Sequence, residues 1–110
     1  MDAEEFQKSW SQMAAAETFT HVVEVAEQSR GVDAVQTRLV HNNIFFVMKQ
    51  QRGEGESLYF SAKSVKSAVF LLEAAISPGV PRVTISLKAS DPTLSQHFIQ
   101  AVSFLLSTSY

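Results

Sequence analysis

All 3 prolines of the chain lie in one stretch, S-P-G-V-P-R-V-T-I-S-L-K-A-S-D-P, which runs from residue 77 to residue 92. Proline cannot donate a hydrogen bond to a strand ladder, so it marks where regular structure begins or ends. Pro78-Gly79 is typical of a turn, and Asp91-Pro92 is typical of a helix N-cap and first helical residue. Residues 82–89 alternate between apolar and polar side chains. The stretch therefore predicts a turn, one half-buried strand and a helix.

The rest of the chain shows the same two periodicities. Apolar residues three or four positions apart predict helices, and β-rich or alternating segments predict strands. We expect helices at 3–16, 32–40 and 93–107, strands at 19–25, 44–50, 57–63, 68–76 and 82–89, and a polar hairpin tip at 52–56. Segment 68–76 is ambiguous, because its Leu and Ala residues favour a helix. Its shortness and the Pro-Gly turn directly after it favour a strand.

This order predicts an α+β fold: a mostly antiparallel five-stranded sheet flanked by three helices. At 110 residues the chain is long enough for one domain, residues 1–110, with its own hydrophobic core. A hydrophobic content of 45% with 18% charged residues is typical of a globular protein and excludes a disordered one.

Composition also narrows the classes of partner and compartment. The chain contains no cysteine, which excludes disulfides and thiolate metal sites and fits a cytosolic protein. The net charge of −2 gives no electrostatic reason to expect a nucleic-acid partner. No apolar run approaches the roughly 18–20 residues of a membrane span, so we expect no direct membrane insertion.

Strand parity divides the expected sheet into two faces. One face is uniformly apolar and should pack in the core: Leu58, Phe60, Phe70, Leu72, Val83, Ile85 and Leu87. The other face is mixed: Phe45, Val47, Lys49, Tyr59, Ser61, Lys63, Val69, Leu71, Glu73, Thr84, Ser86 and Lys88. The first helix can cover half of this mixed face through Trp10 and still leave a groove. Apolar pockets beside charges of both signs are typical of surfaces that recognise peptides.

Residues suited to catalysis form no recognisable pattern. His21, His41 and His97 lie on three different expected elements, at spacings that match no metal or catalytic motif. We therefore expect a non-enzymatic protein without metal, nucleotide or other cofactor. Two alternatives stay open. A small hydrolase would require a deep polar pocket with a perturbed titratable group, and a self-associating structural domain would use the mixed face as a two-fold interface.

Six segments in order resemble the platform subdomain of β-adaptin appendages: F-Q-K-S-W, N-N-I-F-F-V-M-K, L-Y-F-S-A-K, L-L-E-A-A-I-S-P-G-V-P, T-I-S-L-K and L-S-Q-H-F-I-Q-A-V. The resemblance covers essentially the whole chain. It implies a TBP-like platform of sheet and helices, at the carboxyl end of a large subunit of a vesicle-coat adaptor. It also implies that the domain has no enzymatic activity and binds short linear motifs in accessory and cargo-adaptor proteins. Some members of the family also bind clathrin.

The resemblance further implies a set of peptide-binding residues. The family's pocket Trp, Tyr and Glu fall on Trp10, Tyr59 and Glu73, and its basic strand residue falls on Lys88. Val69 and Leu71 lie on the same predicted face and complete the set. We expect the three pocket residues to line one groove for a short peptide with hydrophobic anchors. Glu73 would pair with a basic residue or backbone amide of the peptide, and Lys88 with an acidic group.

The sequence also departs from this family. Where the family carries L-T-N-G-I-W, residues 64–69 read S-V-K-S-A-V, so the tryptophan is missing and clathrin-type or endocytic preferences are not carried over. Divergence of this kind resembles the β subunit of adaptor complex four more than those of complexes one or two. That resemblance implies work at the cytoplasmic face of the trans-Golgi network and transport vesicles, without clathrin. It implies the epsin-like protein tepsin as accessory partner, and contact with other adaptor subunits through the rest of the parent chain.

Overall fold

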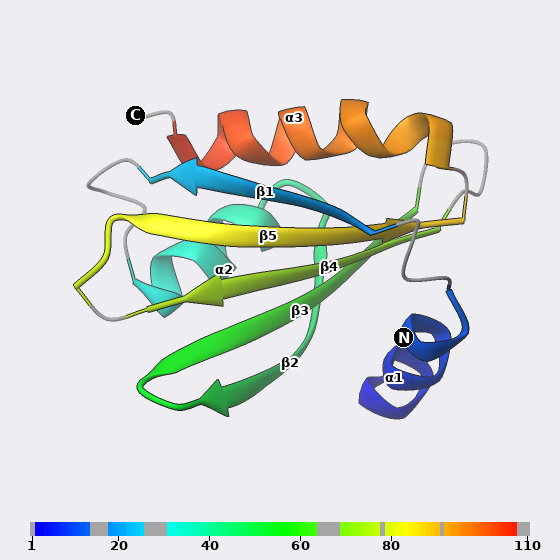
Figure 1. Ribbon diagram of the computed structural model, residues 1–110, viewed down its shortest axis with the longest axis horizontal. Coiled ribbons are helices and arrows are strands. Elements are labelled where there is room, and N and C mark those ends of the chain that lie inside the picture. The colour runs from blue at the N-terminus through cyan, green and yellow to red at the C-terminus, as the bar shows by residue number, and fades with distance from the viewer. Residues whose placement is uncertain are drawn as a thin grey trace.

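The computed structural model describes residues 2–13, 18–25, 31–63, 69–77, 79–90 and 92–107 (Figure 1). In chain order the elements are α1 (Ala3–Gln12), β1 (Phe19–Glu24), α2 (Val32–Val40), β2 (Phe45–Arg52), β3 (Gly55–Lys63), β4 (Val69–Ile76), β5 (Arg82–Ala89), the 3-10 helix η3 (Pro92–Leu94) and α3 (Ser95–Ser107). The predicted α+β fold is confirmed, and the ambiguous segment 68–76 contains a strand. Within the described ranges, no helix has the length and apolar character to cross a membrane.

The five strands form one antiparallel sheet in the order β1-β5-β4-β3-β2. Strands β2 to β5 follow one another as a meander, and the last of them then pairs with β1, with Phe19 opposite Leu87 and Glu24 opposite Arg82. The meander needs tight turns. Gly53 and Gly79 sit in two of these turns with φ angles of 59° and 73°, which glycine adopts without steric cost.

Helices α2 and α3 cover one face of the sheet, which we call the core face. Figure 1 shows α3 running along β1 and β5, with α2 also against the sheet and α1 apart from both. All seven residues predicted to point into the core are buried, together with Val35 and Leu39 of α2 and Ile99, Val102 and Leu106 of α3. Because two helices cover this face, these seven strand residues are all apolar.

Several element boundaries differ from the predicted ones. Helix α1 begins where the Asp2 carboxylate accepts a hydrogen bond of 2.8 Å from the Glu5 amide, but it ends at Gln12, because Met13 is extended. The expected helix to residue 16 is therefore too long; residues 14–16 lie outside the described ranges. The last helix opens with a 3-10 turn and becomes α-helical only at Ser95. Its expected N-cap, Asp91, and Pro78 of the predicted turn also lie outside the described residues.

The β2–β3 hairpin is longer than predicted and contains a β-bulge. Strand pairing continues to Arg52 and Gly55, so the tip is shorter than residues 52–56. Phe46 pairs with Phe60 and Met48 with Tyr59, which leaves Val47 as the extra residue. Each position after a bulge changes face.

The bulge overturns one predicted side-chain position. Lys49 was expected on the mixed face, but it pairs with Leu58 and therefore lies on the core-face side. There its ammonium lies 3.7 Å from the Glu56 carboxylate. The mixed face receives Met48, Gln50 and Arg52 instead.

Candidate functional site

Helix α1 packs on the mixed face of the sheet, which we call the groove face. Phe6 is buried against Tyr59 and Leu71, which are also buried. The Phe6 ring meets Tyr59 edge to face at a centroid distance of 5.4 Å and stacks on Trp10 at 5.7 Å. Burial of a phenylalanine side chain stabilises a fold by about 1.5–3 kcal/mol. Phe6 is therefore the anchor that holds α1 on this face.

Lys88 fixes the other end of α1. The residue is only 8% exposed, and its ammonium donates hydrogen bonds to the carbonyl oxygens of Trp10, at 2.8 Å, and Met13, at 3.3 Å. The last carbonyls of a helix have no partner within the helix, so a cation there satisfies them. The same ammonium lies 4.6 Å from the centre of the Trp10 ring. Lys88 thus sets the position of Trp10.

Replacing Lys88 with methionine should lower the free energy of unfolding by about 1–3 kcal/mol, because two carbonyl oxygens lose a charged donor. Relative to the wild type, amide hydrogen exchange should speed up more in α1 than in β3. Lys63→Met, at an exposed lysine of the same sheet face, is the control. Equal protection of α1 in the two variants would show that Lys88 does not hold the helix.

A hollow of about 300 Å³ lies between α1 and the strands beneath it. It is lined by Phe6, Gln7, Trp10, Ser11, Met48, Gln50, Arg52, Tyr59 and Glu73. We call this hollow the groove. The structure thus brings together three of the six residues expected at the site, Trp10, Tyr59 and Glu73. The other three lie beside it: Leu71 and Val69 pack against Phe6 and its neighbours, and Lys88 is covered by Trp10.

Sequence parity missed Met48, Gln50 and Arg52 as groove residues. Their side chains reach the groove only because the bulge at Val47 changes the face of every later residue in β2. The pattern I-F-F-V-M-K-Q-Q-R contains no glycine or break in β propensity that marks a bulge there.

Three polar side chains meet in the groove. Arg52 donates a hydrogen bond of 2.7 Å from Nη2 to the hydroxyl of Tyr59, and the same nitrogen lies 3.5 Å from a carboxylate oxygen of Glu73. Tyr59 and Glu73 face each other on β3 and β4. Burial, and then the Glu73 carboxylate, raise the pKa of Tyr59 above its ordinary value of 10.0, and Arg52 opposes this shift.

This raised pKa predicts a specific loss of stability in alkali. Below about pH 10 the phenol is protonated in both folded and unfolded chains, so its contribution is fully present. Above that pH the unfolded chain releases the proton first, and the free energy of unfolding falls as pH rises through the folded pKa. Urea titrations from about pH 8 to pH 11 measure this change. The free energy of unfolding of Tyr59→Phe should fall less steeply with pH than that of the wild type. Parallel curves for the two proteins would contradict the assignment.

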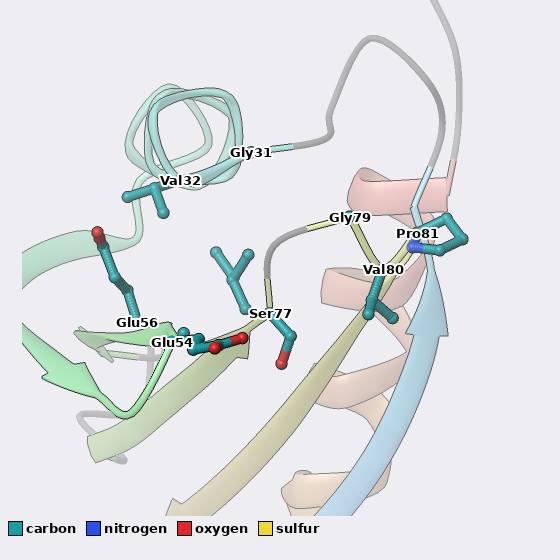
Figure 2. A pocket seen from close by; sticks show the side chains of 10 residues that line it. Gly31, Val32, Glu54, Glu56, Ser77, Gly79, Val80 and Pro81 are labelled. Atoms are coloured by element: carbon teal, nitrogen blue, oxygen red, sulfur yellow. The ribbon is translucent and has the colours of Figure 1, made fainter.

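A second and larger hollow, of about 470 Å³, lies where the β2–β3 and β4–β5 turns approach the start of α2 (Figure 2). Glu54, Glu56, Ser77 and Val80 are among its lining residues. The two hairpins come close here, since a Cβ on Gly55 would lie 2.6 Å from the carbonyl oxygen of Ile76. None of the residues expected at the site lines this hollow.

Comparison with known proteins places the chain in a family. Residues 1–106 match the family described as the beta2-adaptin appendage, C-terminal sub-domain. The chain is 31% identical over 106 residues to "AP-1 complex subunit beta-1" of Mus musculus, covering 96% of this chain and 11% of that protein. It is 39% identical over 74 residues to the Rattus norvegicus protein of the same name, covering 67% of this chain and 8% of that protein. It thus spans only a small part of the length of these relatives. With a match across nearly all of its residues, the chain belongs to the family of beta2-adaptin appendage C-terminal subdomains.

Proposed function

We propose that this domain is a non-enzymatic interaction module of a vesicle-coat adaptor, which binds short hydrophobic peptide motifs of accessory proteins. The observation that carries the proposal is the groove: α1 is fixed over the sheet so that Trp10, Tyr59 and Glu73 line one hollow. Family membership supports it, because the family is described as an adaptin appendage and the relatives are by name subunits of the AP-1 complex.

The groove has the features that peptide recognition uses. Trp10 and Met48 offer partly exposed apolar surface, and large aromatic side chains give contact area at low entropy cost. The polar group of Arg52, Tyr59 and Glu73 can set the direction of a bound chain more than its affinity. A hollow of about 300 Å³ is large enough for one or two anchor side chains of a peptide.

The cellular setting is part of the same proposal. The parent protein acts in vesicle trafficking at the cytoplasmic face of the trans-Golgi network and binds the other adaptor subunits through the rest of its chain. The departure from the family at residues 64–69 supports the β subunit of adaptor complex four as the parent, with tepsin as accessory partner. A pull-down from cytosol with the wild-type domain and with Trp10→Ala tests the partner, since a groove-bound protein should be lost from the variant.

The binding function is tested by selecting phage-displayed random peptides on the domain and titrating the selected peptides into ¹⁵N-labelled protein. We expect selected sequences rich in large hydrophobic residues, with the largest amide shifts around Trp10, Tyr59 and Glu73. Shifts centred on Glu56 and Ser77 would place binding in the second hollow instead. Failure to select any peptide, with groove shifts that depend on protein concentration, would favour the self-associating alternative.

A further inference from the structure

Arg52 enters the groove at a point where sequence parity places no cation. Its guanidinium contacts both Tyr59 and Glu73 through one nitrogen, and its side chain is 60% exposed, so solvent and a bound peptide can reach it. The Glu73 side chain, by contrast, is 17% exposed. Glu73 is thus the inner partner of this pair, and Arg52 the outer.

We propose that Arg52 determines the specificity of the groove: it occupies Glu73 from within the chain, so that the groove selects hydrophobic peptides whose residue opposite Glu73 is neutral or acidic. This inference rests on the proposed function. Without Arg52, the Glu73 carboxylate would keep the neutral Tyr59 hydroxyl as a neighbour but no cation, and it would attract a basic residue of the peptide. With Arg52 in place, a peptide cation must displace or approach the guanidinium, whereas a carboxylate or backbone carbonyl meets free donors.

The charges around the groove support this selectivity. Among the residues that line it, Arg52 and Glu73 are the charged ones, and they balance each other. Lys88, a further cation of this sheet face, is buried beneath Trp10 and bound to α1. No other lining residue can therefore offset the loss of Arg52.

The contribution of Arg52 to folding is expected to be small. Ion pairs with an exposed partner add little to stability, because solvent screens them and the long side chain loses conformational freedom. A substitution at Arg52 should therefore change peptide preference while leaving the fold intact. A purely structural role would predict the reverse.

The test compares Arg52→Gln with Arg82→Gln. Arg82 is a matched control, because its side chain is 61% exposed and its guanidinium lies 3.9 Å from the Glu24 carboxylate. This pair lies on β5 and β1, at the sheet edge opposite β2. Peptides selected on the wild-type domain are resynthesised with Lys, Gln or Glu at each non-anchor position, and their affinities are measured by calorimetry. In the wild type and Arg82→Gln, Lys at one position should weaken binding about tenfold relative to Gln. In Arg52→Gln this penalty should vanish or become a preference.

A second readout follows the contact itself. Because Arg52 opposes the rise in the Tyr59 pKa, alkaline absorbance titration of Arg52→Gln should show a higher Tyr59 pKa than that of Arg82→Gln. If Lys still weakens binding about tenfold in Arg52→Gln, the inference is wrong, although peptide binding by the groove is not contradicted. The same holds if the Tyr59 pKa is unchanged in Arg52→Gln. Absence of any selected peptide on the wild type overturns the proposed function itself.

Discussion

Replacing Phe60 with alanine is expected to lower the free energy of unfolding by about 3–5 kcal/mol. Phe60 lies in β3, with neighbouring strands on both sides, and none of its side chain is exposed. Its ring meets Phe46 edge to face at 5.6 Å, and it pairs with Leu72 on β4. The alanine variant loses this apolar contact and leaves a cavity that a sheet packed under two helices cannot close. Urea unfolding followed by circular dichroism measures the change.

The control for this stability prediction is Phe45→Ala. Phe45 is 66% exposed on the neighbouring strand, so the same truncation there should change the free energy of unfolding by less than about 0.5 kcal/mol. Because small domains unfold with only about 5–15 kcal/mol in total, the Phe60 variant should lose a large part of the stability of the domain. Similar losses in the two variants would mean that the core is not centred on β3.

Replacing Trp10 with alanine should weaken binding of a groove-selected peptide roughly thirtyfold, which corresponds to about 2 kcal/mol. Trp10 lines the groove and is partly exposed, and its ring contacts both Phe6 and the Lys88 ammonium. A side chain that is already held by two contacts contributes contact area while losing little further freedom on binding. Calorimetry measures the affinity, after NMR has shown that α1 stays folded.

Phe45→Ala serves again as the matched variant for binding. Its ring is exposed on the groove face but does not line the groove, so its loss tests whether any aromatic group on this face is enough. We expect wild-type affinity for this variant. Equal weakening by both substitutions would place the peptide across the whole face and not in the groove.

Much of the architecture follows from periodicity. The alternation in residues 82–89 and the β-rich segments before it predicted the strands and the core face, because side chains on a strand alternate strictly between two faces. Phe60 and Leu72, for example, had to face the same way as soon as two strands were paired. The helix boundaries were less accurate: no residue around Met13 signals that α1 ends at Gln12, where the Trp10 carbonyl accepts a hydrogen bond from the distant Lys88.

The sequence by itself determined which strand residues point into the core and that Leu71 and Glu73 share the other face, since these depend on spacing within single strands and on which alternate residues are apolar. Only the tertiary structure decided which charges reach the groove. The single extra residue at Val47 moved Lys49 away from the groove face and brought Arg52 onto it. A bulge reverses parity without changing composition, so nothing local in the sequence reports it. The burial of Lys88 beneath Trp10 likewise depends on residues 78 positions apart, a distance at which periodicity carries no information.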